Sequence, residues 1–234
     1  MQITLKEIRY QTATVLSLIF TKPPGFSFKA GQFLRWTFPV DACDQRCNTR
    51  NFSVASSPTE DFLMCSFRIG VSALKRAIPN FAVGTKVSII GPLGRFILDD
   101  TNLPIVILAG GVGITPVRSM LKYISDTKSP RLLTLLYSNH TPAEIAFKED
   151  MDRWSSTDLN LNIVHTITRP TESDVWTGRT GRINEAMVNE YTKDIKTTQF
   201  YTCGPPKMVD SIRTMLANMG IPEEHLHSER FTGY

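Results

Sequence analysis

The sequence lacks most features that would set it apart from ordinary globular proteins. It has only 4 cysteines in 234 residues, too few for the disulfide framework of a small secreted domain. Its 14 glycines and 14 prolines are ordinary usage, which excludes collagen-like and low-complexity sequence. A hydrophobic fraction of 41% with 21% charged residues excludes a disordered chain. We therefore expect a globular protein with reduced thiols and room for one large domain or two modest ones.

Charge of one sign and long apolar runs are also scarce. The formal net charge is +4, far from the basic footprint of a nucleic-acid-binding protein. The longest apolar stretch, 103–114, is interrupted by Pro104 and three glycines and is shorter than the roughly 20 residues that span a bilayer. The first 20 residues alternate like a strand and do not resemble a signal peptide. These absences predict a cytoplasmic protein with no membrane span and no nucleic-acid partner, and leave its oligomeric state open.

Two groups of potential metal ligands stand out, and neither has the spacing of a metal site. Cys43 and Cys47 share a polar loop, but no second Cys or His pair follows at ligand spacing. The segment 223–227 holds two Glu and two His residues near the end of the sequence. We interpret the first as a surface loop and the second as a solvated terminal segment, and we predict no metal.

The first 99 residues have the pattern of a small antiparallel β-barrel. Short runs rich in Val, Ile, Phe and Thr alternate with clusters of Pro, Gly, Asn and Asp, which is typical of strands joined by turns. The expected strands are 3–10, 13–20, 32–38, 52–55, 63–69 and 86–91, with a short helix over 72–81.

Residues 100–234 instead alternate buried strands with amphipathic helices, which predicts a parallel sheet covered on both faces. The boundary lies near 99–103. The expected strands begin at 104 and 132 and cover 161–168 and 199–203, and the expected helices are 115–125, 147–154, 184–191 and 207–219.

The strongest local motif is LAGGVGITP at 108–116. An apolar strand runs into Gly110, Gly111 and Gly113, and a helix begins near Thr115. The N–H groups and dipole of such a helix start favour an anion, and a pyrophosphate is the natural guest. The spacing is not the G-x-G-x-x-G dinucleotide fingerprint, so glycines that only tighten the packing of strand and helix are an equal alternative.

Two further motifs carry polar chemistry. YTCGPPKM at 201–208 ends the last predicted strand before the final helix, at the sheet edge where ligands bind in α/β folds; its Cys203 thiol can face that crevice or be a buried structural cysteine. RNFSVASSP at 50–58 places Arg50 and Phe52 on one side of an extended strand and Ser53 on the other. A phosphate and a flat ring fit the first side, and an ordinary edge strand is the alternative.

Together, and in this order, these motifs resemble the ferredoxin–NADP reductase superfamily over nearly the whole chain. Residues 50–53 are similar to its flavin motif Arg-x-Tyr-Ser/Thr, and Gly91–Gly94 to the Gly-Pro-x-Gly turn that closes the barrel. Residues 108–116 are similar to its pyrophosphate loop, and 203–205 to its nicotinamide Cys-Gly motif. The resemblance implies a two-domain fold: an N-terminal antiparallel β-barrel (1–99) that binds flavin, and a C-terminal α/β parallel-sheet nucleotide-binding domain (100–234) whose tail returns to the flavin.

The resemblance also implies roles for individual residues. Ser53 hydrogen-bonds flavin N5, Cys203 lines the nicotinamide position, and Glu229 orients Ser53 or passes protons. The residues implied to bind the flavin are Arg50, Phe52, Ser53, Val54, Gly70, Val71, Ser72, Phe231 and Tyr234. The residues implied to bind the dinucleotide are Gly110, Gly111, Val112, Gly113, Thr115, Pro116, Thr168, Arg169, Cys203, Gly204, Pro205 and Met208.

Several of these assignments have alternatives. Phe52 replaces the family's usual Tyr, which keeps the ring face and removes a hydroxyl. Ser72 either contacts the flavin phosphate or only caps the following helix, and either Phe231 or Tyr234 covers the flavin ring. Thr168-Arg169 resembles the Ser-Arg pair of NADP-specific members, whereas 139–141 resembles NADH-using relatives.

The resemblance implies FAD, with FMN the less favoured flavin, and NAD(P)H as co-substrate. The implied activity is hydride transfer from NAD(P)H to FAD, with electrons passed to a ferredoxin, a flavodoxin or another redox protein. Two alternatives remain. One is a flavin-binding electron-transfer subunit, with little activity alone, that docks on a larger oxygenase or reductase complex. The other is a flavin-free dehydrogenase that uses only the Gly-rich half.

Overall fold

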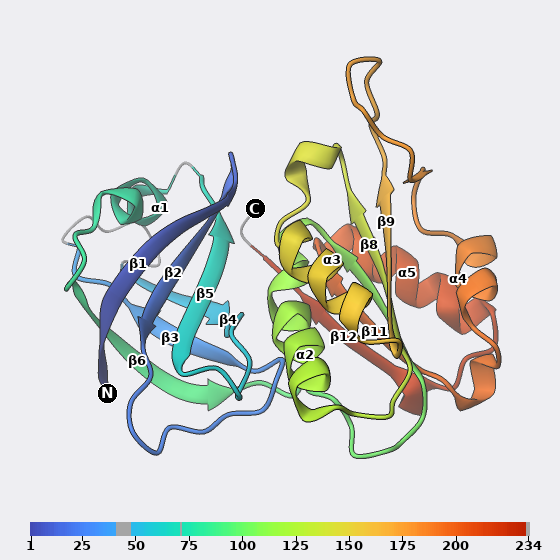
Figure 1. Cartoon of the computed structure of the whole chain (residues 1–234), viewed down its shortest axis with the longest axis horizontal. Helices are drawn as coiled ribbons and strands as arrows, with labels where there is room; N and C mark the ends of the chain where they lie inside the picture. Colours follow the sequence, from blue (N-terminus) through green and yellow to red (C-terminus); the bar gives the residue numbers. More distant parts are fainter. Residues whose placement is uncertain (41–47, 71, 233–234) are drawn as a thin grey trace. The chain divides into compact units, whose positions relative to one another are not determined.

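The computed structural model describes residues 1–40, 48–70 and 72–232 (Figure 1). The chain divides into two compact units. The first contains 1–98 together with 115–123, and the second contains 99–114 and the residues from 124 onward. The segment 115–123, which the sequence groups with the second half, thus belongs to the first unit. Cys43, Cys47, Val71 and Tyr234 lie outside the described residues.

The first unit is an antiparallel six-stranded sheet. Its strands are β1 (Gln2–Thr12), β2 (Val15–Thr21), β3 (Phe33–Thr37), β4 (Thr49–Ser53), β5 (Phe62–Arg68) and β6 (Lys86–Leu93), and their order is β4-β3-β6-β1-β2-β5. An antiparallel bridge between Val54 and Cys65 joins the ends of the sheet. This closure confirms the predicted barrel.

Alternating apolar residues fill the interior of the barrel. Leu16, Leu18 and Phe20 lie on one face of β2 and pack in a core that includes Trp36, because successive strand residues point to opposite faces. The Trp36 indole N–H donates to the Phe52 carbonyl at 3.1 Å, so the core also holds β4 in place. The expected helix over 72–81 is a short α1 (Ala73–Ala77) followed by a 3-10 turn, η1 (Ile78–Asn80).

The second unit is a parallel sheet with helices, as predicted. Its strands are β7 (Ile105–Gly110), β8 (Leu133–Asn139), β9 (Leu161–Ile167), β10 (Arg179–Thr180), β11 (Gln199–Gly204) and β12 (Leu226–Arg230), in the order β10-β9-β8-β7-β11-β12. The helices in this half of the sequence are α2 (Ile114–Thr127), of which 115–123 belong to the first unit, α3 (Lys148–Thr157), α4 (Glu185–Tyr191) and α5 (Pro206–Asn218). The 3-10 turns are η2 (Gly111–Gly113), η3 (Pro142–Glu144), η4 (Ile195–Thr197) and η5 (Glu223–His225). Side chains of α4 and α5 pack with those of β7, β8 and β11 in one core.

The interpretation of 223–227 as a solvated segment is wrong for its last two residues. Leu226–Arg230 forms β12, which pairs in parallel with β11 along its whole length. His227 stacks on Tyr201 with ring centroids 4.4 Å apart and shares a hydrogen bond with Gln199 at 2.9 Å. Within the described ranges, no three His, Cys, Asp or Glu side chains gather as metal ligands, and no helix has both the length and the apolar character to cross a bilayer.

Candidate functional site

Strand β4 carries the first group of candidate residues, and its pairing with β3 fixes them. Arg50 lies opposite Trp36, and Ser53 lies opposite Phe33. Arg50 is buried, and its Nη1 donates to the Thr49 carbonyl at 2.8 Å. The Ser53 hydroxyl is buried and has no hydrogen-bond partner among the described residues. A buried hydroxyl without a partner is costly, so Ser53 fits a ligand that brings a hydrogen-bonding atom.

The residues on either side of Ser53 are held by the barrel. The Phe52 ring stacks on Phe67, with centroids 5.1 Å apart and planes at 17°. The Val54 N–H donates to the Gln32 carbonyl at 2.9 Å. One face of Phe52 thus contacts the core, and the backbone around Ser53 has a fixed position.

Ser72, one of the candidate flavin contacts, has a structural role at the start of α1. The Ser72 hydroxyl accepts the Lys75 N–H at 3.3 Å and caps α1, which is the structural alternative for this residue. The neighbouring Gly70 approaches the Lys75 side chain, since a Cβ there would lie 3.2 Å from Lys75 Cδ. Flavin-phosphate contacts of Gly70 and Ser72 stay predictions.

In the second unit, the Gly-rich turn packs directly against the Cys-Gly motif. A Cβ on Gly113 would lie 2.6 Å from the Cys203 carbonyl oxygen, and one on Gly110 would lie 2.2 Å from Met208 Sδ. Gly111 has a φ of +52°, and its carbonyl accepts the Tyr137 hydroxyl at 3.0 Å. Close packing therefore accounts for Gly110 and Gly113, as the structural alternative proposed.

Helix α2 begins directly after this turn, with Gly113 at its N-cap and no side chain capping it. The N–H groups of a first helical turn have no partner within the helix, and the dipole there favours an anion. Val112 lies within η2, and the buried Thr115 and Pro116 lie in the first turn of α2. The turn and the helix start together have the chemistry of a phosphate site.

Cys203 and Glu229 lie side by side on adjacent strands, in register. The fully buried Cys203 thiol donates to the Gly113 carbonyl at 3.1 Å. Burial, with a further contribution from Glu229, raises the pKa of Cys203 well above its ordinary value, so the group is a neutral thiol. Burial also raises the pKa of Glu229 to about 7, and its Oε2 has no hydrogen-bond partner among the described residues. Glu229 can therefore hold or release a proton near neutrality.

The tail after β12 is tied to the Cys-Gly motif by one backbone hydrogen bond. The N–H of the half-buried Phe231 donates to the carbonyl of Gly204 at 2.9 Å. Pro205, also half-buried, immediately precedes α5. Phe231 thus has a defined backbone position beside the candidate dinucleotide residues.

The ends of β8 and β9 bring together the two groups of residues that bear on the choice of dinucleotide. His140 Nδ1 lies 3.0 Å from Thr168 Oγ1, and the Arg169 N–H donates to the His140 carbonyl at 2.8 Å. The Arg169 side chain is exposed, whereas Arg179 donates to the Tyr191 hydroxyl at 3.2 Å. Arg169 is therefore better placed than Arg179 to meet a ligand phosphate.

The sequence reasoning missed Arg118, Glu60 and His165. Arg118 lies on the apolar side of its helix, next to the buried Val117, and His165 lies in its strand between the half-buried Val164 and the buried Thr166. A charged or titratable residue within an apolar pattern is a usable signal, because such groups are rarely buried without a reason.

His165 should make the protein less stable in acid. Its side chain is 10% exposed, and burial lowers its pKa to about 4, with Asp152 opposing the shift and Lys148 adding to it. The unfolded chain takes up this proton below about pH 6.5, and the folded chain only below about 4. Stability contributed by the neutral ring is thus present above pH 6.5 and is lost as the pH falls toward 4, by about 3 kcal/mol in total.

Urea unfolding between pH 7 and 4 tests this expectation. His165→Gln should flatten the loss of unfolding free energy relative to wild type, and His140→Gln, a change at an exposed histidine, should not. An unchanged slope in His165→Gln would contradict the assignment.

Comparisons with known proteins show a matching domain, similar folds and several relatives. Residues 107–214 match the family described as the oxidoreductase NAD-binding domain. The structure of a ferredoxin NADP⁺ reductase from Neisseria gonorrhoeae, with bound FAD and NADP, superposes with a TM-score of 0.81, 21% identity and 98% coverage of both chains. The likeness to this reductase is one of fold, an antiparallel barrel and a parallel sheet with helices.

Two relatives are named as components of larger systems. A component of the Na(+)-translocating NADH-quinone reductase of Shewanella denitrificans is 30% identical over 199 residues, which is 79% of this chain and 49% of that protein. The reductase component of the glycine betaine monooxygenase of Chromohalobacter salexigens is 30% identical over 220 residues, 90% of this chain and 58% of that protein. The chain thus spans about half the length of these relatives.

Proposed function

We propose that this chain is an NAD(P)H-dependent flavoprotein reductase that passes electrons to a separate acceptor. The observation that carries the proposal is the buried Ser53 hydroxyl, which has no partner among the described residues and lies in the superfamily's flavin motif. A hydrogen-bond acceptor or donor on a flavin ring satisfies it. In this proposal residues 1–99 bind FAD and residues 100–234 bind the dinucleotide.

The barrel supplies the flavin contacts. When bound, FAD would supply the redox chemistry: acceptance of a hydride (one proton and two electrons) from NAD(P)H, which leaves NAD(P)⁺, and then release of the two electrons singly to the acceptor and of the proton to solvent. Arg50 offers a guanidinium to the FAD phosphates, and Ser53 orients the ring through its hydroxyl. The further proposed flavin contacts are Phe52, Val54, Gly70, Val71 and Ser72, with Phe231 or Tyr234 against the ring.

The second unit supplies the dinucleotide contacts. The backbone of 110–113 and the start of α2 offer N–H groups to the pyrophosphate, and Cys203 to Met208 line the nicotinamide position. Thr168 and Arg169 follow the carboxyl end of β9, and in this proposal they contact the 2′ position of the ribose and so influence the choice between NADH and NADPH. The Cys203 thiol is neutral, and the Glu229 carboxyl group, whose pKa is raised, can hold a proton near neutral pH.

Charge supports an acidic acceptor protein. Residues 1–98 contain twelve Lys and Arg and five Asp and Glu, a formal charge of +7, whereas residues 99–234 carry −3. A basic flavin half attracts an acidic one-electron carrier and raises its rate of encounter, which favours a ferredoxin or a flavodoxin in a shared cytoplasmic compartment. The second candidate is a docking subunit of a larger complex, which the names of the relatives favour.

The deciding measurement is the visible absorption spectrum of the chain with one equivalent of FAD, recorded anaerobically before and after NADPH or NADH. We expect a flavin band that one of the dinucleotides bleaches. Ser53→Ala should slow the bleaching by about 10-fold, the loss expected for one hydrogen bond of about 1.4 kcal/mol. Ser88→Ala, an exposed change on β6, is the matched control.

The other outcomes separate the alternatives. A flavin band that neither dinucleotide bleaches favours the docking subunit. Failure of the chain to bind added FAD or FMN contradicts the flavin assignment and favours the flavin-free dehydrogenase.

A further inference from the structure

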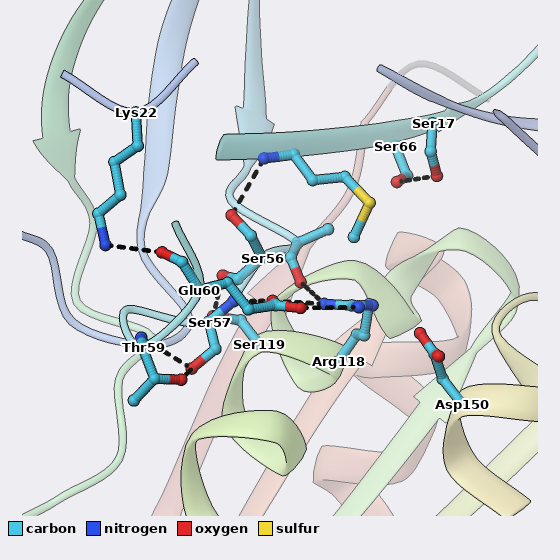
Figure 2. A network of polar contacts seen from close by, with 12 residues as sticks. Ser17, Lys22, Ser56, Ser57, Thr59, Glu60, Ser66, Arg118, Ser119 and Asp150 are labelled. Atoms are coloured by element: carbon cyan, nitrogen blue, oxygen red, sulfur yellow. Dashed lines mark hydrogen bonds and ion pairs between the residues drawn. The ribbon is translucent and has the colours of Figure 1, made fainter. Parts of the chain in front are cut away.

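Two residues of helix α2 hold the chain segment that follows Ser53 (Figure 2). Arg118 Nη1 donates to the Ala55 carbonyl at 2.9 Å and to Glu60 Oε2 at 2.9 Å, and its Nη2 donates to Glu60 Oε1 at 3.3 Å. The Ser119 hydroxyl donates to the Ser56 carbonyl at 2.7 Å. All these residues belong to the first unit, and we call them the α2 latch.

The segment is also braced from its other side. The Glu60 carboxylate accepts the Ser57 N–H at 2.6 Å. Lys22 Nζ donates to the Pro58 carbonyl at 2.7 Å and to the Glu60 carbonyl at 2.9 Å. The turn that begins two residues after Ser53 therefore has little freedom to move.

The Arg118–Glu60 pair is buried, with side chains 6% and 12% exposed. Buried ion pairs contribute little net stability compared with apolar residues of the same size, because both charges lose their hydration. Such a pair contributes more to geometry than to stability, because the planar guanidinium group of Arg118 holds the Glu60 carboxylate and the Ala55 carbonyl in fixed directions at the same time. An apolar pair could fill the same space, but it would not fix the Ala55 carbonyl.

We propose that Arg118 and Glu60 are positioning residues for hydride transfer: through the Ala55 carbonyl they hold the chain segment that carries Ser53 and so set its hydroxyl against the proposed flavin. This inference rests on the proposed function. Neither residue is required to touch FAD or NAD(P)H. Their removal should therefore impair the placement of Ser53 against the flavin more than the binding of FAD or NAD(P)H.

The test compares Arg118→Lys, Glu60→Gln and the double variant Arg118→Leu/Glu60→Met with Arg9→Lys. Arg9 pairs with Glu7 on the exposed surface of β1 and is the matched control. The double variant removes both charges and leaves neither unpaired. For each protein, the limiting rate of flavin bleaching, the NAD(P)H concentration for half the limiting rate, and the affinity for FAD are measured below the onset of unfolding.

We expect the three latch variants to lose at least about 10-fold in limiting rate, since a displacement of about 1 Å can cost about 100-fold. The half-saturating concentration and FAD affinity should change by less than about 3-fold, under about 0.7 kcal/mol. Without added nucleotide, the backbone amides of 53–60 should exchange with deuterium faster in these variants than in wild type and Arg9→Lys.

Wild-type limiting rates and exchange in the folded double variant would overturn the proposal. So would loss of folding in all three variants, because the pair would then serve stability alone. A wild-type chain that binds FAD and is not bleached overturns the proposed reductase activity itself, whereas normal bleaching with unaffected variants overturns only the positioning role.

Discussion

Replacing Gly113 with alanine should destabilise the second unit by about 3 kcal/mol or more, the upper range for overpacking. A Cβ at this position would lie 2.6 Å from the Cys203 carbonyl oxygen and 2.7 Å from the Gly204 Cα. These are backbone atoms of β11, which is paired with β7 and β12, so they cannot move without disturbing the sheet. The φ of Gly113 is −59°, which alanine adopts freely, so the cost is steric.

Gly110→Ala is the matched control for this change. Its Cβ would instead meet the end of the Met208 side chain, with the nearest backbone-attached ring carbon, Pro205 Cδ, at 3.7 Å. Met208 can rotate away, because methionine has three rotatable bonds, so we expect a loss of about 1 kcal/mol. Urea unfolding of both variants measures the difference, and equal losses would show that the contact of Gly113 with Cys203 is not decisive.

Glu229→Gln should remove a pH dependence of opposite direction to that of His165. The pKa of Glu229 is about 7 in the folded protein, against 4.5 ordinarily, because the carboxyl group is buried. A raised pKa means that the folded state holds the proton more tightly than the unfolded state. The stability it contributes is fully present below pH 4.5 and is lost as the pH rises through 7, by up to about 3 kcal/mol.

The variant should therefore be more stable than wild type at pH 8 and should lose that advantage toward pH 4.5. Urea unfolding from pH 4.5 to 8 gives the two curves, and Glu224→Gln on the exposed turn η5 is the control. Parallel curves for Glu229→Gln and wild type would mean that Glu229 ionises normally. Limiting bleaching rates over the same pH range report whether the proton of Glu229 is used in the reaction.

The features that sequence reasoning located correctly are those encoded over a few residues. Strand alternation, the Gly-rich turn and the change of period near residue 100 are local patterns, and they predicted both sheets. The alternative roles of Ser72 and Gly113 were also visible locally. The structural alternative holds for both residues: Ser72 caps α1, and Gly113 lies close to the backbone of Cys203 and Gly204.

The features that could not be predicted from the sequence depend on contacts between residues far apart in the chain. The ion pair of Arg118 and Glu60 joins residues 58 positions apart, and the Cys203 thiol reaches a carbonyl 90 positions away. Strand β12 has the polar sequence LHSER, and its extended form comes from hydrogen bonding to β11 rather than from its own pattern. The lone hydroxyl of Ser53 likewise becomes visible only when its neighbours are known.

The grouping of 115–123 with the barrel changes how this protein can be taken apart. A fragment cut after residue 98 would keep all six strands and lose Arg118 and Ser119, leaving the carboxylate of Glu60 and two backbone carbonyls without these donors. It would also lose the buried Val117 and Leu121. In gene fusion or domain exchange, the transferable barrel unit is therefore discontinuous, and a recombination point placed at the apparent sequence boundary separates parts of one compact unit.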